Sequence, residues 1–479
     1  MVFLALVMAI GIGLVGNRES QAAFSEPAIA PVMMSSPLAP PPVTGSTYYV
    51  DKNNLGGACS HNNPGTQTQP WCTIKKAMQT LRAGDRAYIR AGTYSEGSLR
   101  PSNSGTPGNY ITFQAYPGET PVINCTRTNL CIDGWSSGAA SYIVYNGLEI
   151  YGPEQIISCQ GTSGCHHIWM VNGKYHDYHK FFIERGAHNI VLSNNEIYNV
   201  RDQAISVGED SNGIIIEFNR LYDNGRDADD DGAAKCFKAW NCVMRYNTVY
   251  NNYRNPSSSR SCFNPGNCQG VTGLYIDLNK DGSIAGAMSY IYNNTLYNND
   301  IGIQVYETSG VRVFNNVVYN NGHKPGSGQF VFNYGMGITI SNSSSNVWVD
   351  NNTIYGNENE AINLHGTGSD IRVRNNIIMS NGGGIAGSTS GKVVSNNITG
   401  GVAFANAAAG DFHLAPGSSA INGGTAIPLY KFDRDNAARP QGGAYDVGAY
   451  EYGGSGHRRP PRQPQRRPPV PPPHLRQAP

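Results

Sequence analysis

The sequence has little excess of either charge. Its 479 residues hold 35 Lys and Arg against 34 Asp and Glu, which gives a formal net charge of +1, and charged residues make up 14% of the chain. A protein that binds nucleic acid usually shows a basic excess, and none is present over the whole chain. We therefore expect no nucleic-acid partner.

The chain also lacks a hydrophobic run long enough to span a bilayer. The longest apolar stretch, Val2–Val15, is shorter than the roughly 20 residues that a membrane-spanning helix needs, and small residues follow it at Gln21–Ala23. Although the usual basic residues before such a stretch are missing, a signal peptide over residues 1–23 is the best interpretation. We expect a secreted or cell-surface monomer without a membrane span in the mature chain.

Two segments lack the pattern of a folded domain. Residues 24–46 are rich in Pro, Ser and Ala and predict a linker. Residues 453–479 include a stretch, His457–Pro479, with six Arg, nine Pro and no acid, which is typical of disordered chain. This tail is either solvated without a partner or attaches the protein to an acidic cell-surface polymer. The folded domain is predicted over residues 47–452.

The ten cysteines fall into local pairs. Four pairs share one spacing, whereas a zinc site would more often use a two-residue gap. Short-range pairs in an exported chain predict five disulfides. The pairs are Cys59 with Cys72, Cys125 with Cys131, Cys159 with Cys165, Cys236 with Cys242, and Cys262 with Cys268.

A short motif of paired asparagines followed by a β-branched run recurs along the chain. The stretch Tyr292–Asn299 is a typical copy, and copies follow each other at intervals of mostly about 20 to 30 residues, with the three longest steps being 28, 36 and 47 residues. Such units bury their apolar face only against their neighbours, and Asn suits tight corners and stacks its side-chain amides from coil to coil. The second Asn of each copy is Asn195, Asn219, Asn247, Asn294, Asn316, Asn352, Asn376 and Asn397.

A second run with a period of two follows most copies, as in Ala204–Val207 and Gly302–Val305. Its second and fourth residues should point inward and its third outward. The sequence thus predicts an all-β fold, a right-handed parallel β-helix made of a single-stranded solenoid of about a dozen coils that ends near Asp446–Glu451. The helical spacing of Thr73–Leu81 predicts a short N-terminal capping helix, because an uncovered terminal coil exposes its core.

The longer steps mark insertions that enter at one corner of the coil. They are residues Asn224–Gly232, Tyr253–Gly270 and Gly322–Tyr334. Loops that project together from one edge of a solenoid usually wall a binding groove, whose floor is formed by the outward side chains beneath them. The predicted register places one row at Ser206, Lys235, Tyr275, Gln304, Thr339 and Asn363, and a second at Phe237, Asp277 and Tyr306, with Glu307 at the strand end.

These residues suit carbohydrate. Lys235, Asp277 and Glu307 are the candidate catalytic residues, and Tyr275, Gln304 and Tyr306 are the candidate substrate-binding residues. The alternative is an ordinary aromatic ladder beside a solvated Lys.

The first insertion has acids at alternate positions followed by Gly232. Asp227, Asp229 and Asp231 are candidate calcium ligands, because oxygen-rich loops of this form bind Ca²⁺. Asp277–Gly282 repeats the opening of this motif. The alternative at both places is a solvated polar turn.

The chain resembles the secreted family-nine pectate lyases, which are right-handed β-helix polysaccharide lyases. The resemblance rests on Tyr48–Val50, Ala91–Tyr94, Ala420–Gly424 and Asp446–Glu451. It implies a polysaccharide substrate and calcium. The calcium-binding and catalytic strands of that family are not matched at Val271–Tyr275 and Gly302–Val305, and Asp231–Lys235 is the nearer match.

Three functions are open. A lyase would cleave an acidic, uronate-containing polysaccharide by β-elimination, with a bound cation and with Lys235 as a base whose pKa is lowered by neighbouring positive charge. A glycoside hydrolase would use Asp277 and Glu307 on adjacent coils. A non-catalytic protein would only bind carbohydrate. If the site is catalytic, Lys235→Ala and Asp277→Ala should abolish turnover with little loss of stability, because outward residues bury little surface.

Overall fold

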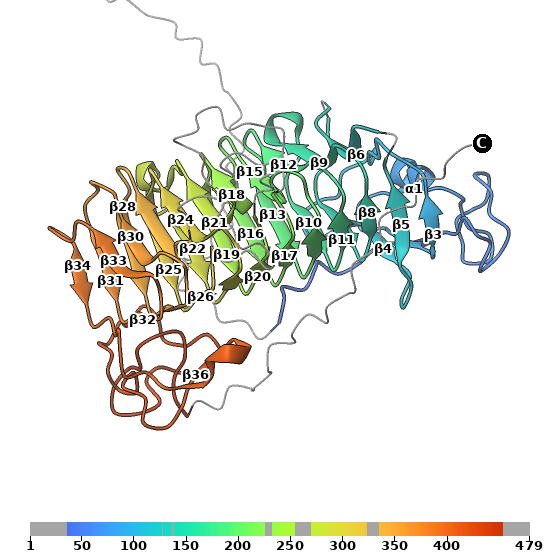
Figure 1. The fold of residues 1–479 in the computed structure, drawn as a ribbon. Coiled ribbons are helices and arrows are strands. Elements are labelled where there is room, and N and C mark those ends of the chain that lie inside the picture. Colours follow the sequence, from blue (N-terminus) through green and yellow to red (C-terminus); the bar gives the residue numbers. More distant parts are fainter. Residues whose placement is uncertain are drawn as a thin grey trace, which may run out of the picture.

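The chain winds into a right-handed parallel β-helix, as the repeats predict. In the computed structural model, residues 36–126, 128–136, 138–225, 232–253, 270–322 and 335–453 are described. Most coils contribute one short strand to each of three long parallel sheets, which have 13, 11 and 10 strands and run along the solenoid (Figure 1).

The strands of each sheet pair with their neighbours one coil away. Sheet A consists of β1 (Thr47–Val50), β2 (Arg86–Ile89), β4 (Ile111–Ala115), β7 (Ile143–Asn146), β10 (Ile168–Val171), β13 (His188–Ser193), β16 (Asn212–Glu217), β19 (Trp240–Arg245), β22 (Ser289–Tyr292), β25 (Ser309–Phe314), β28 (Ser345–Asp350), β31 (Ile371–Arg374) and β34 (Val393–Ser395). Sheet B consists of β3 (Gly92–Tyr94), β5 (Pro121–Asn124), β8 (Glu149–Tyr151), β11 (Lys174–His176), β14 (Glu196–Tyr198), β17 (Arg220–Tyr222), β20 (Thr248–Tyr250), β23 (Thr295–Tyr297), β26 (Val317–Tyr319), β29 (Thr353–Tyr355) and β32 (Ile377–Met379). Sheet C consists of β6 (Leu130–Gly134), β9 (Gln155–Gln160), β12 (Lys180–Glu184), β15 (Ile205–Val207), β18 (Gly232–Phe237), β21 (Thr272–Asp277), β24 (Ile301–Tyr306), β27 (Ile338–Ser341), β30 (Glu360–Leu364) and β33 (Gly383–Gly387).

The core fills the space inside the three sheets. In one coil, sheet A contributes Leu192, sheet B contributes Ile197 and sheet C contributes Ile205, and none of the three is exposed. Each coil repeats this pattern, because alternate residues of every strand point inward.

The paired asparagines form a continuous ladder inside the corner between sheets A and B. The side chain of Asn247 donates to Asn294 Oδ1 at 3.0 Å, and Asn294 donates to Asn316 Oδ1 at 3.0 Å. The same bond recurs from Asn195 to Asn397. The predicted stacking of side-chain amides is therefore confirmed.

The corner itself needs a left-handed backbone. The residue before each ladder position has a positive φ, such as 56° at Asn194 and 56° at Asn293. Asn adopts this conformation more easily than most residues, as predicted. Phe218 and Tyr246 occupy the same position in two coils, with φ of 54° and 55°, so the coil repeat imposes the corner even where the residue does not favour it.

A second asparagine ladder lies at the corner between sheets B and C. Asn252 donates to Asn299 at 2.8 Å, Asn299 to Asn321 at 3.0 Å, and Asn321 to Asn357 at 2.8 Å. The sequence analysis did not identify this ladder, although these residues end the same repeated motif.

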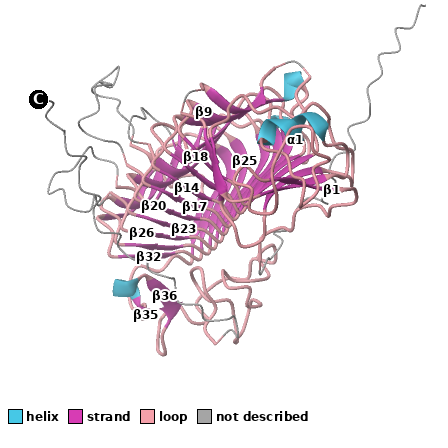
Figure 2. Cartoon of the chain, turned by 90° about the vertical axis from the view of Figure 1, so that its right-hand side faces the viewer, coloured by secondary structure: helices cyan, strands magenta, loops and turns pink. Residues whose placement is uncertain are grey.

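The predicted capping helix is present. Helix α1 (Ile74–Thr80) begins after Thr73, whose side chain accepts a hydrogen bond from the N–H of Lys76. Ile74, Ala77 and Met78 are buried against the core. The helix lies at the N-terminal end of the stack of coils (Figure 2), where it covers apolar side chains that a terminal coil would otherwise expose.

The C-terminal region differs from the prediction. The coils end at β34 rather than near Asp446–Glu451, and the following chain folds back beside the stack (Figure 1). It contains the antiparallel strands β35 (Phe404–Asn406) and β36 (Asp411–Leu414).

Apolar contacts and hydrogen bonds hold this segment against the solenoid. The Tyr430 ring stacks on Phe314 at 4.3 Å, and Arg439 donates to Asn315 Oδ1 at 3.2 Å. Within the segment, Arg439 pairs with Glu451 at 2.7 Å, with neither side chain exposed. The stretch Asp446–Glu451, which was predicted to end the coils, instead belongs to this packed segment.

Four of the predicted disulfides are confirmed: Cys59–Cys72, Cys125–Cys131, Cys159–Cys165 and Cys236–Cys242. Cys262 and Cys268 lie outside the described residues, as do residues 1–35 and 454–479. Leu38, in the described part of the predicted linker, donates its N–H to Glu217 Oε1 at 2.6 Å. Among the described residues, no helix has the length and apolar character to cross a membrane.

We expect Asn294→Ala to destabilise the protein strongly. Asn294 accepts from the Asn247 backbone and donates to Met244 O as well as to Asn316. Its loss leaves several buried polar groups unpaired, at a cost of roughly 2–4 kcal/mol. Chemical denaturation measures the change, and Asn62→Ala at an exposed position serves as the control. A change below about 0.5 kcal/mol at position 294 would contradict the role of the ladder.

Candidate functional site

Three long connections reach sheet C at the same corner of the coil. They join β17 to β18, β20 to β21, and β26 to β27, and the middle parts of all three lie outside the described residues. The prediction that the insertions enter together, before the strands of sheet C, is therefore confirmed.

The outward rows of sheet C have the predicted register. Lys235 pairs with Ser206 on one side and with Tyr275 on the other, and Gln304, Thr339 and Asn363 continue the row. In the second row Asp277 lies between Phe237 and Tyr306. Side chains from six successive coils thus share one face.

Lys235 and Asp277 form an ion pair at the centre of this face. Lys235 Nζ lies 2.9 Å from Asp277 Oδ2, and the two side chains are 11% and 7% exposed. The ammonium also lies 4.6 Å from the centre of the Tyr275 ring and 5.4 Å from that of Phe237. Cation–π contacts of this length add to the charge pair in holding Lys235 in place.

The structure corrects the expectation that these outward residues are open to solvent. Tyr275 is 1% exposed and Gln304 is 4% exposed. Lys235 lies over the Tyr275 ring, and Gln304 Oε1 accepts from Thr272 at 2.9 Å. Side chains of neighbouring coils cover one another, because coils are only about 4.8 Å apart. Tyr275 therefore supports Lys235 instead of offering a free face to a sugar, whereas Tyr306 is half-buried.

Glu307 lies at the end of the second row. It follows β24 at the corner, with φ of 48°, and it is exposed, while Asp277 lies within β21 and is buried. Because Asp277 pairs with Tyr306, the residue before Glu307, the two acids come from adjacent coils, as predicted.

The proposed calcium ligands Asp227, Asp229 and Asp231 lie outside the described residues. In the second acidic loop, Asp281 is buried and accepts hydrogen bonds from Asn241 N–H at 2.8 Å and from Ser289 Oγ at 2.6 Å. Burial raises the pKa of Asp281 to about 6. A carboxylate occupied by these donors is part of a structural turn, which favours the polar-turn interpretation of this loop.

The lyase hypothesis expected a positive charge beside Lys235. The group in direct contact is instead the Asp277 carboxylate, and Lys238 lies on the Phe237 ring, 4.8 Å from its centre. A second cation therefore shares Phe237 with Lys235, but an acid holds the Lys235 ammonium.

A group of three histidines, His166, His167 and His188, was missed by the sequence analysis. Their ligating nitrogens lie within 4.8 Å of one another at a corner between sheets C and A. The sequence does contain a signal for this group, because His188 follows the His166–His167 pair by one coil.

A family model described as "Pel9A-like, right handed beta helix region" matches residues 49–324, and a model described as "Right handed beta helix region" matches residues 329–415. Among curated proteins, the uncharacterized protein YwoF of Bacillus subtilis (strain 168) is 38% identical over 81 residues. The match covers 17% of this chain and 16% of that protein.

Two solved structures are similar to this chain. The complex of XylC with xylose has a TM-score of 0.52 and 14% identity, over 74% of this chain and 83% of that chain, and this likeness concerns the fold alone. Pectate lyase Pel9A has a TM-score of 0.45 and 14% identity, over 86% of this chain and 97% of that chain.

The burial of the ion pair predicts that it contributes to stability. We expect Lys235→Met and Asp277→Asn each to lower the free energy of unfolding by roughly 1–3 kcal/mol, because each change leaves the partner charge in a largely buried place. Denaturant unfolding of both single variants and of the double variant measures the coupling.

The matched control is the ion pair of Lys280 with Asp210, whose side chains are 41% and 60% exposed. Asp210→Asn should change stability by less than about 0.5 kcal/mol. If Asp277→Asn changes stability as little as Asp210→Asn does, the Lys235–Asp277 pair is solvated, as the sequence analysis expected of outward residues.

Proposed function

Because the chain belongs to the Pel9A-like right-handed β-helix family, we propose that it is a secreted enzyme that cleaves an acidic, uronate-containing polysaccharide by β-elimination. The observation that carries the proposal is the Lys235–Asp277 pair on adjacent coils. It lies on the face of sheet C at whose corner three long connections enter. Secretion is supported by the four disulfides and by the predicted signal peptide.

The proposed reaction begins with removal of a proton from the carbon next to the carboxylate of the substrate. In a uronate chain, the C–H next to the carboxyl group becomes acidic when the carboxylate is neutralised. The Lys235 ammonium would first lose a proton to solvent, and its neutral Nζ would then take the proton from this carbon. The carbon–carbon double bond would form, and the glycosidic oxygen would leave with the bonding electrons and take a proton from water. The uronate carboxylate would carry a second negative charge to the face, next to Lys235 and Lys238.

Asp277 has a positioning role in this proposal. Its contact with Nζ and the Tyr275 ring beneath fix the direction of the Lys235 side chain before substrate arrives. The pair has to open for Lys235 to reach the substrate. Precise placement of a base can contribute several orders of magnitude to the rate.

A calcium ion is proposed from the residue types in the first insertion and from their position in the sequence. Asp227, Asp229 and Asp231 would hold a Ca²⁺ ion, which would neutralise the uronate carboxylate. Their position next to β18 in the sequence favours this assignment, since Gly232 begins that strand.

We expect the purified protein to release unsaturated products from pectate or alginate and to leave a neutral glycan intact. The ultraviolet absorbance of the new double bond reports elimination, and a chelator should reduce it. New reducing ends without this absorbance would instead establish hydrolysis. Binding of a glycan that the protein never degrades would establish the non-catalytic alternative.

The Lys235→Arg variant tests whether Lys235 acts as a base or only supplies a positive charge. Arg retains a positive charge for Asp277 and for the Tyr275 ring, but it stays protonated and cannot act as a base. We expect turnover to fall by at least about 100-fold while binding of the acidic glycan is retained.

The control for this variant is Lys75→Arg at an exposed position on α1. Turnover by Lys235→Arg at the wild-type rate would show that Lys235 is not the base. Calorimetric titration with an acidic oligosaccharide measures the binding of both variants.

A further inference from the structure

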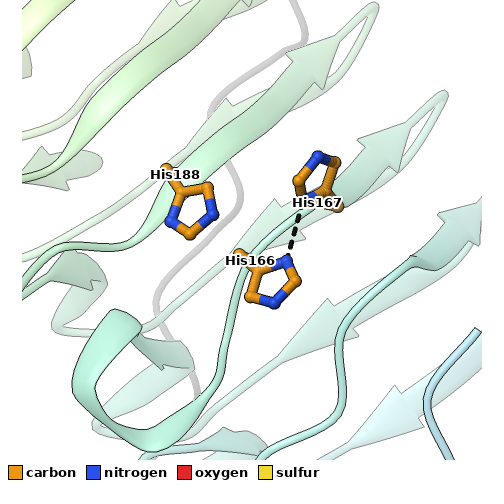
Figure 3. A group of neighbouring side chains, drawn as sticks. All are labelled: His166, His167 and His188. Atoms are coloured by element: carbon orange, nitrogen blue, oxygen red, sulfur yellow. Dashed lines mark hydrogen bonds between the residues drawn. The ribbon is translucent and has the colours of Figure 1, made fainter. Parts of the chain in front are cut away.

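Three histidines gather where two successive coils turn from sheet C to sheet A (Figure 3). His166 and His167 lie between Cys165 and β10, and His188 begins β13 one coil further on. The backbone N–H of His167 donates to the carbonyl of His188 at 2.9 Å, which fixes the two coils together at this point. All three side chains are half-buried.

The ring nitrogens face one another closely. His166 Nδ1 and His167 Nδ1 are 2.7 Å apart, and one ligating nitrogen of each of the three rings lies within 4.8 Å of the others. Two facing nitrogens at 2.7 Å share one proton, because a bond of this length needs one donor and one acceptor. A metal ion could take the place of that proton.

The protonation of His188 is set by its neighbour. Its Nδ1 lies 3.1 Å from the carbonyl oxygen of Gly186, which can only accept, so Nδ1 carries the proton and Nε2 keeps its lone pair. The side-chain nitrogen of Asn189 donates to His167 Nε2 at 2.9 Å, so the proton of a neutral His167 lies on Nδ1. Turning the Asn189 amide so that its oxygen faces Nε2 would move this proton to Nε2 and free Nδ1 as a ligand. Metal-binding histidines typically donate the N–H of their second nitrogen to an oxygen in this way.

The ligand type indicates which metal ions the group suits. Neutral imidazole suits zinc and its neighbours among the first-row transition metals, whereas calcium and magnesium prefer oxygen ligands.

We propose that His166, His167 and His188 bind a divalent transition-metal ion of the Zn²⁺ type, with a water molecule in the fourth position. Zinc–nitrogen bonds of about 2.0–2.1 Å in a tetrahedral site place two ligand nitrogens about 3.3 Å apart. His166 and His167 would thus separate slightly, and His188 would approach. The His166 and His188 rings are stacked, with their centres 4.7 Å apart, so one of them would rotate about its Cβ–Cγ bond.

Such an ion would clamp two coils beside the Cys159–Cys165 disulfide. The site is separate from the Lys235–Asp277 face, because its residues come from coils that contain β9 and β12, while Lys235 and Asp277 lie on β18 and β21. The proposal is therefore independent of the proposed lyase activity. The competing interpretation is an aromatic stack, in which Tyr142 lies on His167 with ring centres 4.4 Å apart and no metal is bound.

Calorimetric titration of the untagged, chelator-treated full chain with ZnCl₂ tests the proposal. We expect saturable binding of one equivalent at this site and a rise in melting temperature, while CaCl₂ gives no effect through it. Co²⁺ should give the visible absorption of a site with nitrogen ligands. His188→Phe keeps a ring to stack on His166 but has no ligand nitrogen, and it should weaken Zn²⁺ binding by at least about tenfold.

His365→Phe, at an exposed position, is the matched control and should bind Zn²⁺ like the wild type. Circular dichroism of the metal-free variants shows whether they fold, and His166→Phe replaces His188→Phe if the latter does not. The proposal is overturned if the wild type takes up no Zn²⁺ in a saturable manner. It is equally overturned if a folded His188→Phe or His166→Phe variant binds Zn²⁺ as tightly as the wild type.

Discussion

The stacked asparagine side chains fix the register of this solenoid. Each buried amide donates to the amide of the next coil and to a backbone carbonyl, as Asn294 does with Asn316 and Met244. A slip of one residue would leave these groups unpaired inside the protein and would turn the inward residues outward. The ladder therefore sets which residues of each coil form the core and which form the outer faces.

The candidate site is a direct consequence of this register. Lys235 and Asp277 are separated by a long insertion in the sequence, yet their strands are neighbours in sheet C, and the next coil adds Tyr306 beside Asp277. An insertion between sheets B and C lengthens the chain without changing the stacking, because the coils on either side keep their amide bonds. The solenoid can thus carry long loops beside a fixed row of charged and aromatic side chains.

The sequence predicted the solenoid, its cap and the rows of sheet C, because the period of two and the asparagine spacing are local signals. It did not predict the burial of Tyr275, which depends on how Lys235 packs over it, nor the fold-back of the chain after β34, whose contact of Tyr430 with Phe314 joins distant residues. The histidine group also joins two coils, but His166 and His167 lie in the turn before β10, outside the strands whose alternation predicted the rows of sheet C.

The central claim is that an acidic polysaccharide binds over the Lys235–Asp277 pair of sheet C. A crystal structure of the Lys235→Arg variant with an acidic oligosaccharide tests this most directly, because the variant should bind the chain without cleaving it. The claim predicts a sugar ring over residues 235 and 277, with its carboxylate toward Arg at position 235. A sugar chain bound elsewhere, for example along the outer face of sheet B, with this face of sheet C empty, would contradict it.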